Sequence, residues 1–212
     1  MEEIPTIYTI GHSTHQLDYF LELLREYEVN WLIDVRSNPA SSHNPQFNQE
    51  PLSNFLKKNR ITYLHYAEEF GARQTDPAVL DNEGKVDFEK VRKTRQFKNG
   101  LEQIRNGVNK GFVIAIMCSE SEPLDCHRFS MVSVGLKNDG FEVKHILRDK
   151  TIKTNEELEN DLLKKYEKKL PQKDLFNPDI SNEEQLMVAY RLKNNEIGFV
   201  PNINNQKEEY YD

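Results

Sequence analysis

A short apolar run, a polar loop and an amphipathic segment follow one another between residues 111 and 140. The apolar run, 112–117, has the length and composition of a buried strand, whereas 126–137 repeats apolar residues at helical spacing. A strand, loop and helix in this order are typical of α/β sheets, in which ligands bind beyond the carboxyl ends of the strands. We therefore expect chemistry in the connecting loop, which lies between the two cysteines of the chain, Cys118 and Cys126.

The same alternation recurs along the chain. Further strands are predicted at residues 5–10, 30–35, 61–65 and 142–147. The intervening segments place apolar residues at helical spacing, at 17–24, 52–56 and 88–104. Strands that alternate with helices predict a three-layer α/β fold, with a mostly parallel sheet of about five strands and helices on both faces.

The composition changes near residue 150, and this change sets the predicted domain boundaries. Residues 1–150 are predicted to form the α/β domain that carries the site, and 151–200 a helical extension packed on it. Residues 201–212 are polar and are predicted to form a disordered tail. Within the extension, Ser181 and Glu184 have the spacing of a capping box, which predicts that the last helix starts there.

Charge and hydropathy exclude several partners. The net charge of -7 argues against a uniformly basic surface for nucleic acid, although the basic segment 90–98 leaves a local contact open. No apolar run approaches the roughly 20 residues that span a bilayer, so no membrane partner is expected. Residues 1–13 lack the basic start and long apolar centre of a signal peptide, which predicts a cytoplasmic protein with reduced cysteines.

Polar and titratable residues follow three of the predicted strands. Because the carboxyl ends of parallel strands meet at one edge of the sheet, we expect these residues to form one site. The candidate catalytic residues are His12, Asp34, Cys118, Cys126 and His127, and the candidate substrate-binding residues are Ser13, Arg36, Ser41, Glu120 and Arg128.

The two candidate arginines indicate an anion as the substrate. Arg36 and Arg128 can hold a phosphate or a carboxylate through paired N–H donors. The alternative is structural, since each arginine could instead pair with Asp34 or Glu120 and fix the loops. The predicted substrate is a small anionic or nucleotide-like molecule.

The thiols and imidazoles supply the predicted chemistry. Cys118 or Cys126 would act as a nucleophile or redox group, and His12 or His127 would transfer protons, with Asp34 orienting one of them. Neither a dinucleotide-binding fingerprint nor a Walker motif occurs, so no cofactor is assigned.

Two other functions stay open at this point. Cys118, Cys126, His127 and His12 are suitable metal ligands, but their spacing matches no compact zinc pattern, so no residue is assigned as a ligand. The same site could also bind a nucleotide or a nucleic-acid end without catalysing a reaction.

Several of these segments together resemble one protein family. They are TIGHST (9–14), LIDVRSNPAS (32–41), residues 64–71, MCSESEPLDCHR (117–128) and AYRLKNNEIGF (189–199). The chain from about residue 6 to 200 resembles the family called domain of unknown function 488. The resemblance implies a cytoplasmic prokaryotic α/β protein, and it implies no established activity. The family's motif positions correspond here to His12, Ser13, Asp34, Arg36, Pro39, Ser41, Cys118, Glu120, Cys126, His127 and Arg128.

Overall fold

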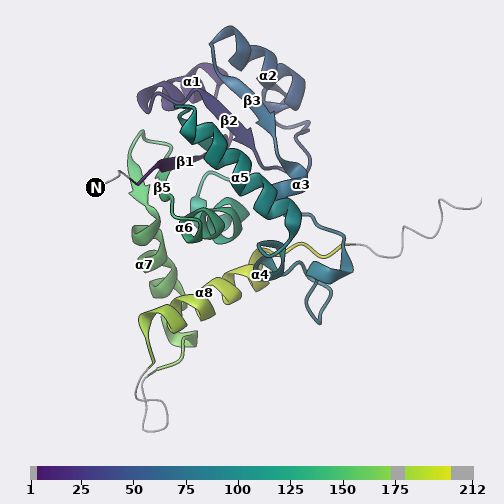
Figure 1. Ribbon diagram of the computed structural model, residues 1–212, viewed down its shortest axis with the longest axis vertical. Coiled ribbons are helices and arrows are strands. Elements are labelled where there is room, and N and C mark those ends of the chain that lie inside the picture. Colours follow the sequence, from purple (N-terminus) through teal and green to yellow (C-terminus); the bar gives the residue numbers. More distant parts are fainter. Residues whose placement is uncertain (1–3, 173–179, 202–212) are drawn as a thin grey trace, which may run out of the picture.

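The computed structural model describes residues 4–172 and 180–201, and a single six-stranded sheet lies at its centre (Figure 1). The strand order is β3-β2-β4-β1-β5-β6. The first five strands are parallel, whereas β6 pairs with β5 in the antiparallel sense. The strands are β1 (Thr6–Gly11), β2 (Trp31–Asp34), β3 (Thr62–His65), β4 (Ile114–Cys118), β5 (Glu142–Ile146) and β6 (Ile152–Thr154). The predicted fold class is confirmed, and β6 adds a short edge strand where only helix was predicted.

Eight α-helices surround the sheet in the described residues. They are α1 (Leu17–Glu26), α2 (Gln49–Lys58), α3 (Ala67–Phe70), α4 (Phe88–Val91), α5 (Arg95–Asn109), α6 (Val134–Asn138), α7 (Asn155–Tyr166) and α8 (Asn182–Ile197). Short 3-10 turns occur at η1 (Pro45–Phe47), η2 (Pro77–Val79), η3 (Pro123–Asp125) and η5 (Glu167–Lys169). The N-cap position of α1 is Gln16, and its side chain makes no capping hydrogen bond.

The predicted helix over 126–137 is not a regular α-helix. A π-helical stretch, η4 (Arg128–Ser133), precedes the short α6. The buried Ser133 hydroxyl donates a 2.7 Å hydrogen bond to the carbonyl oxygen of Arg128, five residues back, which matches the wide π turn. π-helical turns are rare and are often found at functional sites.

Alternate residues of β4 point into two different cores. Ile114, Ile116 and Cys118 pack on one face of the sheet, in the apolar core that includes residues of α5 and α6. Ala115 and Met117 pack on the opposite face, in the core that includes residues of α1 and α2. This alternation follows from the period of two along a strand, so helices cover both faces of the sheet.

Neighbouring strands β1 and β4 send their connections to opposite faces of the sheet. The chain leaves β1 into α1 on one face, whereas it leaves β4 into η4 and α6 on the other. Such a divergence opens a crevice at the carboxyl ends of the two strands, where open α/β sheets bind ligands.

The C-terminal helices α7 and α8 pack together beside the sheet, and Figure 1 shows them below it. A third apolar cluster joins them to the π-helical stretch through Phe129, Leu158, Leu162 and Ala189. The predicted capping box is confirmed, since the Ser181 side chain and the N3 glutamate satisfy each other's backbone N–H groups. The predicted tail, 201–212, lies outside the described residues except for Pro201.

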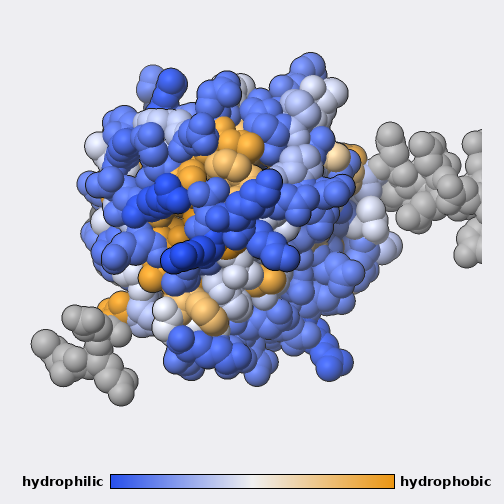
Figure 2. Space-filling view, turned by 90° about the horizontal axis from the view of Figure 1, so that it is seen from above, coloured by the Kyte–Doolittle hydropathy of each residue, from blue (hydrophilic) through white to orange (hydrophobic). Residues whose placement is uncertain are grey.

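The surface seen from above is mainly hydrophilic, with hydrophobic residues showing between the hydrophilic ones (Figure 2). Among the residues that the structure describes, no helix has the length and apolar character needed to cross a membrane.

Candidate functional site

Backbone hydrogen bonds join the three loops at the carboxyl edge of the sheet. The amide of His12 donates to the carbonyl of Cys118 at 2.9 Å, and the amide of Ser13 donates to Ser119 at 2.9 Å. On the other side of β4, the amide of Val35 donates to Met117 at 3.0 Å. The polar residues after β1, β2 and β4 are therefore held side by side, as expected for the ends of parallel strands.

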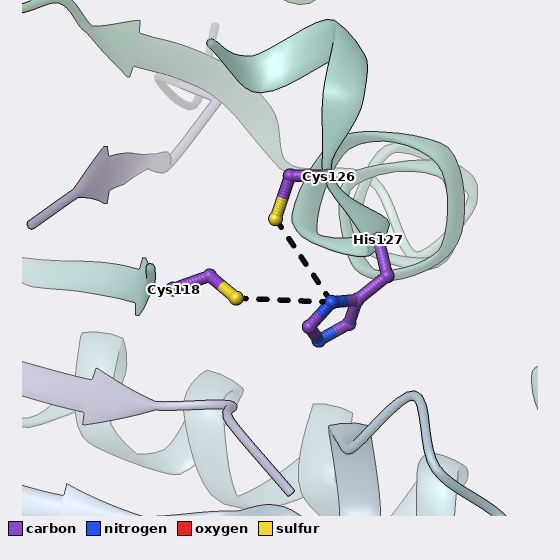
Figure 3. Close-up of side chains that lie close together, drawn as sticks. All are labelled: Cys118, Cys126 and His127. Carbon is purple, nitrogen blue, oxygen red and sulfur yellow. Dashed lines mark hydrogen bonds between the residues drawn. The ribbon is translucent and has the colours of Figure 1, made fainter. Parts of the chain in front are cut away.

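Two thiols and one imidazole converge between these loops (Figure 3). The sulfur of Cys118 lies 3.8 Å from Nδ1 of His127, and the sulfur of Cys126 lies 3.9 Å from the same nitrogen. All three donor atoms lie within 4.8 Å of one another, and all three residues are buried. We refer to Cys118, Cys126 and His127 as the Cys–His cluster.

The imidazole of the cluster has a defined orientation. Nε2 of His127 lies 3.2 Å from the carbonyl oxygen of Val35, which can only accept a hydrogen bond. Nε2 therefore carries a proton, and Nδ1 faces the two sulfurs.

The two thiols have opposite electrostatic environments. Burial opposes ionisation of Cys126, but hydrogen bonding from Cys118 and the positive charges of Arg128 and His127 hold the pKa of Cys126 well below its usual range. The same hydrogen bond and burial raise the pKa of Cys118. Burial lowers the pKa of His127, but the charge of Cys126 outweighs it and the pKa is raised. These effects favour ionisation of Cys126 over ionisation of Cys118.

A carboxylate and a backbone amide contact the Cys126 sulfur. The Cys126 thiol donates a 2.9 Å hydrogen bond to Oε2 of Glu120, and the amide of Arg128 donates to the Cys126 sulfur at 3.4 Å. Glu120 is exposed to solvent. It is placed to accept the proton that Cys126 gives up.

Arg36 and Asp34 form a buried ion pair beside the cluster. Nη2 of Arg36 lies 2.5 Å from Oδ2 of Asp34 and also donates to the Phe47 carbonyl at 2.7 Å. Tyr63 donates to the same Asp34 oxygen at 2.7 Å, and burial together with the Asp34 charge raises the pKa of Tyr63. Asp34 thus contacts an arginine and a tyrosine. For Arg36 the structure shows the ion pair with Asp34, which was the alternative to binding an anion.

His12 lies apart from the Cys–His cluster. Its ring stacks on Phe47 with a centroid separation of 4.3 Å, and its Nε2 accepts a hydrogen bond from Arg36 at 3.1 Å. Burial and the Arg36 charge lower the pKa of His12 to about 4. His12 is therefore neutral near pH 7 and supports the Arg36 side chain.

The remaining candidates shape the loops. The fully buried guanidinium of Arg128 donates to the carbonyls of Glu120 at 2.6 Å and Ser121 at 2.9 Å. Ser13 adopts a left-handed backbone conformation with a φ of 47° in the turn after β1. The hydroxyl of Ser41 accepts the amides of His43 and Asn44 and closes its own loop, whereas neither Ser13 nor Ser41 lines the cavity described next.

A cavity of about 450 Å³ opens onto the cluster. Its walls contain Arg36 and Glu120, which are candidate substrate-binding residues, together with residues outside the candidate set. These additional lining residues are Ser37, Asn38, Ala72, Arg73, Ser119, Asp125 and the C-terminal segment 197–200. Two of the motifs could have indicated part of this lining, because Ser37 and Asn38 continue the motif that contains Arg36, and residues 197–199 end the last motif.

The fold and the site together define an α/β protein with a Cys–His cluster at the carboxyl edge of a mostly parallel sheet. A family model described as "Domain of unknown function DUF488" matches residues 16–134, and the chain belongs to this family. The match confirms the family that the motifs predicted, and it contains every candidate residue except His12 and Ser13. Comparison with curated proteins and with solved structures gives no match.

Proposed function

We propose that this protein is an enzyme that acts on a small anionic, nucleotide-like substrate, with the Cys–His cluster as its catalytic centre. The observation that carries the proposal is that two thiols and an imidazole line an open cavity at the carboxyl ends of β2 and β4. Perturbed titratable groups inside a cavity are typical of catalytic sites. The proposal places the protein in the prokaryotic cytoplasm, where thiols are kept reduced.

The size of the cavity and one exposed arginine on its wall support a small anion as substrate. A volume of about 450 Å³ is in the range of pockets for small molecules. Arg73 lies on its wall, and its guanidinium carbon sits 5.7 Å from the centre of the Phe199 ring. The backbone amide of Arg73 is held by the hydroxyl of Ser37 at 2.9 Å. Arg73 is exposed and is the arginine best placed to meet an incoming phosphate or carboxylate, whereas Arg36 is already paired.

Within this proposal the residues divide into two groups. Cys126 and His127 meet the substrate, and Glu120 transfers protons at the rim of the cavity. Asp34 and His12 act through Arg36, which they hold against the cavity wall. Proton transfer is assigned to His127 rather than His12 because only His127 lines the cavity.

The test is a turnover screen of the purified protein against phosphate esters, nucleotides and small carboxylates. We expect at least one compound to be converted, with conversion lost in Cys126→Ser and KM raised about tenfold or more in Arg73→Ala. Arg60→Ala, at an arginine outside the cavity, is the matched control and should leave turnover unchanged. Tight binding of a nucleotide without conversion would instead support a binding module and would contradict an enzyme.

A further inference from the structure

We infer that the Cys–His cluster is a zinc site with three protein ligands and a fourth position open to the cavity. The ligands would be the sulfurs of Cys118 and Cys126 and Nδ1 of His127. With zinc bound, these side chains would act on a substrate through the ion rather than by direct contact. That use in catalysis rests on the function proposed above, whereas their capacity to bind zinc does not.

The spacing of the donor atoms suits a tetrahedral ion. Zinc binds sulfur at about 2.3 Å and nitrogen at about 2.0 Å, which puts neighbouring sulfur and nitrogen ligands roughly 3.5 Å apart. The observed separations of 3.8 and 3.9 Å need only a few tenths of an ångström of closure. Because the Cys118 side chain points at the ring from the end of β4, this closure needs no change of strand register (Figure 3).

Hydrogen bonding alone does not account for this convergence. The Nδ1 atom of His127 offers one lone pair, or one proton, in the plane of the ring. Both sulfurs nevertheless approach that atom at nearly equal distances. A cation placed between the three atoms would satisfy all of them at once.

The hydrogen bond at the other ring nitrogen of His127 also suits a metal ligand. A histidine that binds a metal through one ring nitrogen usually donates its other ring N–H to a carboxylate or a backbone carbonyl. Nε2 of His127 makes that contact with the carbonyl of Val35 at 3.2 Å. The carbonyl belongs to the segment directly after β2, so the sheet itself fixes the ring orientation.

The donor set selects the ion and leaves one position free. Two thiolates and an imidazole favour zinc over magnesium or calcium, which prefer oxygen ligands. Two thiolates neutralise a divalent ion, which suits a site buried to this degree. Within residues 4–172 and 180–201 no fourth His, Cys, Asp or Glu joins the group. The fourth position would face the cavity, and three protein ligands with an open position are typical of catalytic zinc.

The carboxylate of Glu120 lies near the ligands that would surround this open position. Its Oε2 atom lies 2.9 Å from the Cys126 sulfur, and the residue lines the same cavity. Its carboxylate could therefore accept a proton from a water molecule in the cavity.

The test is a zinc titration of the full-length, metal-stripped protein against a chromophoric chelator. We expect one equivalent of zinc per chain, with affinity lowered by more than about 100-fold in Cys118→Ser, Cys126→Ser and His127→Gln, since loss of even an outer-shell partner costs 10- to 100-fold. His43→Gln, at an exposed histidine outside the cluster, is the control and should bind as the unmodified protein does.

A second measurement keeps the inference testable if a variant fails to fold. Cobalt(II) added to the unmodified protein should give intense thiolate-to-metal absorption and a tetrahedral ligand-field spectrum. Zinc binding by the unmodified protein no tighter than that of the three single variants, or a cobalt spectrum without thiolate absorption, would overturn the site. Conversion of a substrate by the metal-free protein would support the proposed enzyme and would show that its reaction does not need zinc. Tight zinc binding without turnover of any compound would support the zinc site and count against the enzyme.

Discussion

Gly11 and Glu120 lie so close together that a methyl group on Gly11 would sit 1.9 Å from the Glu120 carbonyl oxygen. The same carbonyl accepts the 2.6 Å hydrogen bond from Arg128. Because Gly11 has no side chain, the end of β1 can approach the loop that carries Glu120 and leads to Cys126. A side chain at position 11 would push that loop away from the sheet.

Gly11→Ala is accordingly expected to lower the free energy of unfolding by about 2 kcal/mol or more, since the clash is with backbone rather than with a flexible side chain. Urea unfolding followed by circular dichroism measures the loss. Thr14→Ala, an exposed position in the same turn, should cost less than about 0.5 kcal/mol. Equal stability of the two variants would show that the loop tolerates displacement.

Asp34 and Arg36 should behave as a coupled pair. Asp34→Asn leaves the buried guanidinium of Arg36 without its carboxylate partner and is expected to cost about 3–5 kcal/mol. The double variant Asp34→Leu with Arg36→Met should cost clearly less than the sum of its single variants, because neither charge remains unpaired. Urea unfolding of the four proteins in a double-mutant cycle gives the coupling energy. Strict additivity would mean that the pair contributes no interaction.

His145 should make stability depend on pH. It is fully buried, with its ring nitrogens 2.8 Å from Thr9 and 3.3 Å from Asn155, and with the Phe129 ring against it. Burial and the Arg128 charge lower the pKa of His145 from 6.5 to about 3. As the pH falls below 6.5, the unfolded chain therefore takes up a proton that the folded chain does not. The stability that this histidine contributes is complete above pH 6.5 and is lost progressively towards pH 3.

The measurement is the free energy of unfolding of the unmodified protein and of His145→Gln between pH 7 and pH 4. We expect the unmodified protein to lose up to about 1.4 kcal/mol more per pH unit than the variant below pH 6.5. The exposed His43→Gln should follow the unmodified protein. Parallel curves for the unmodified protein and His145→Gln would show that His145 titrates normally.

Lys193 of α8 forms an ion pair with the loop that precedes Cys126. Its side chain is fully buried, and Nζ contacts Asp125 at 2.9 Å and Glu196 at 3.0 Å. Asp125 immediately precedes Cys126 in the chain. Lys193→Met is expected to cost about 1–3 kcal/mol in urea unfolding, because hydrogen bonds to charged groups are lost. It should also weaken zinc binding, although less than the loss of a ligand does.

The matched control for Lys193 is Lys153→Met, which removes an ion pair of Lys153 with Asp161 at 2.7 Å. Both partners of that pair are partly exposed, so its loss should cost less than about 1 kcal/mol and leave zinc binding unchanged. If the two lysine variants proved equally stable and bound zinc equally, α8 would have no part in holding the loop.

The sequence predicted the layers of the fold because hydrophobic periodicity is a strong signal in strands such as β4. It missed β6, which is three residues long and has no interior alternation to detect. It also predicted a regular helix over 126–137, because spacing of apolar residues does not distinguish an α turn from the π turn that ends at Ser133.

The site was predictable in its location but not in its geometry. Residues after parallel strands must share one edge, so His12, Arg36 and Cys118 were expected together. Whether Cys126 returns to Cys118 depends on the 3-10 turn η3 and on the Arg128 bonds to two loop carbonyls, and no sequence spacing encodes these contacts.

The most direct test of the zinc site is X-ray absorption at the zinc edge of the zinc-loaded protein. The geometry predicts two sulfur scatterers at about 2.3 Å and one imidazole nitrogen at about 2.0 Å, with one further light atom completing four ligands. A shell made only of nitrogen and oxygen, or one that does not change in Cys118→Ser, would contradict a zinc site formed by Cys118, Cys126 and His127.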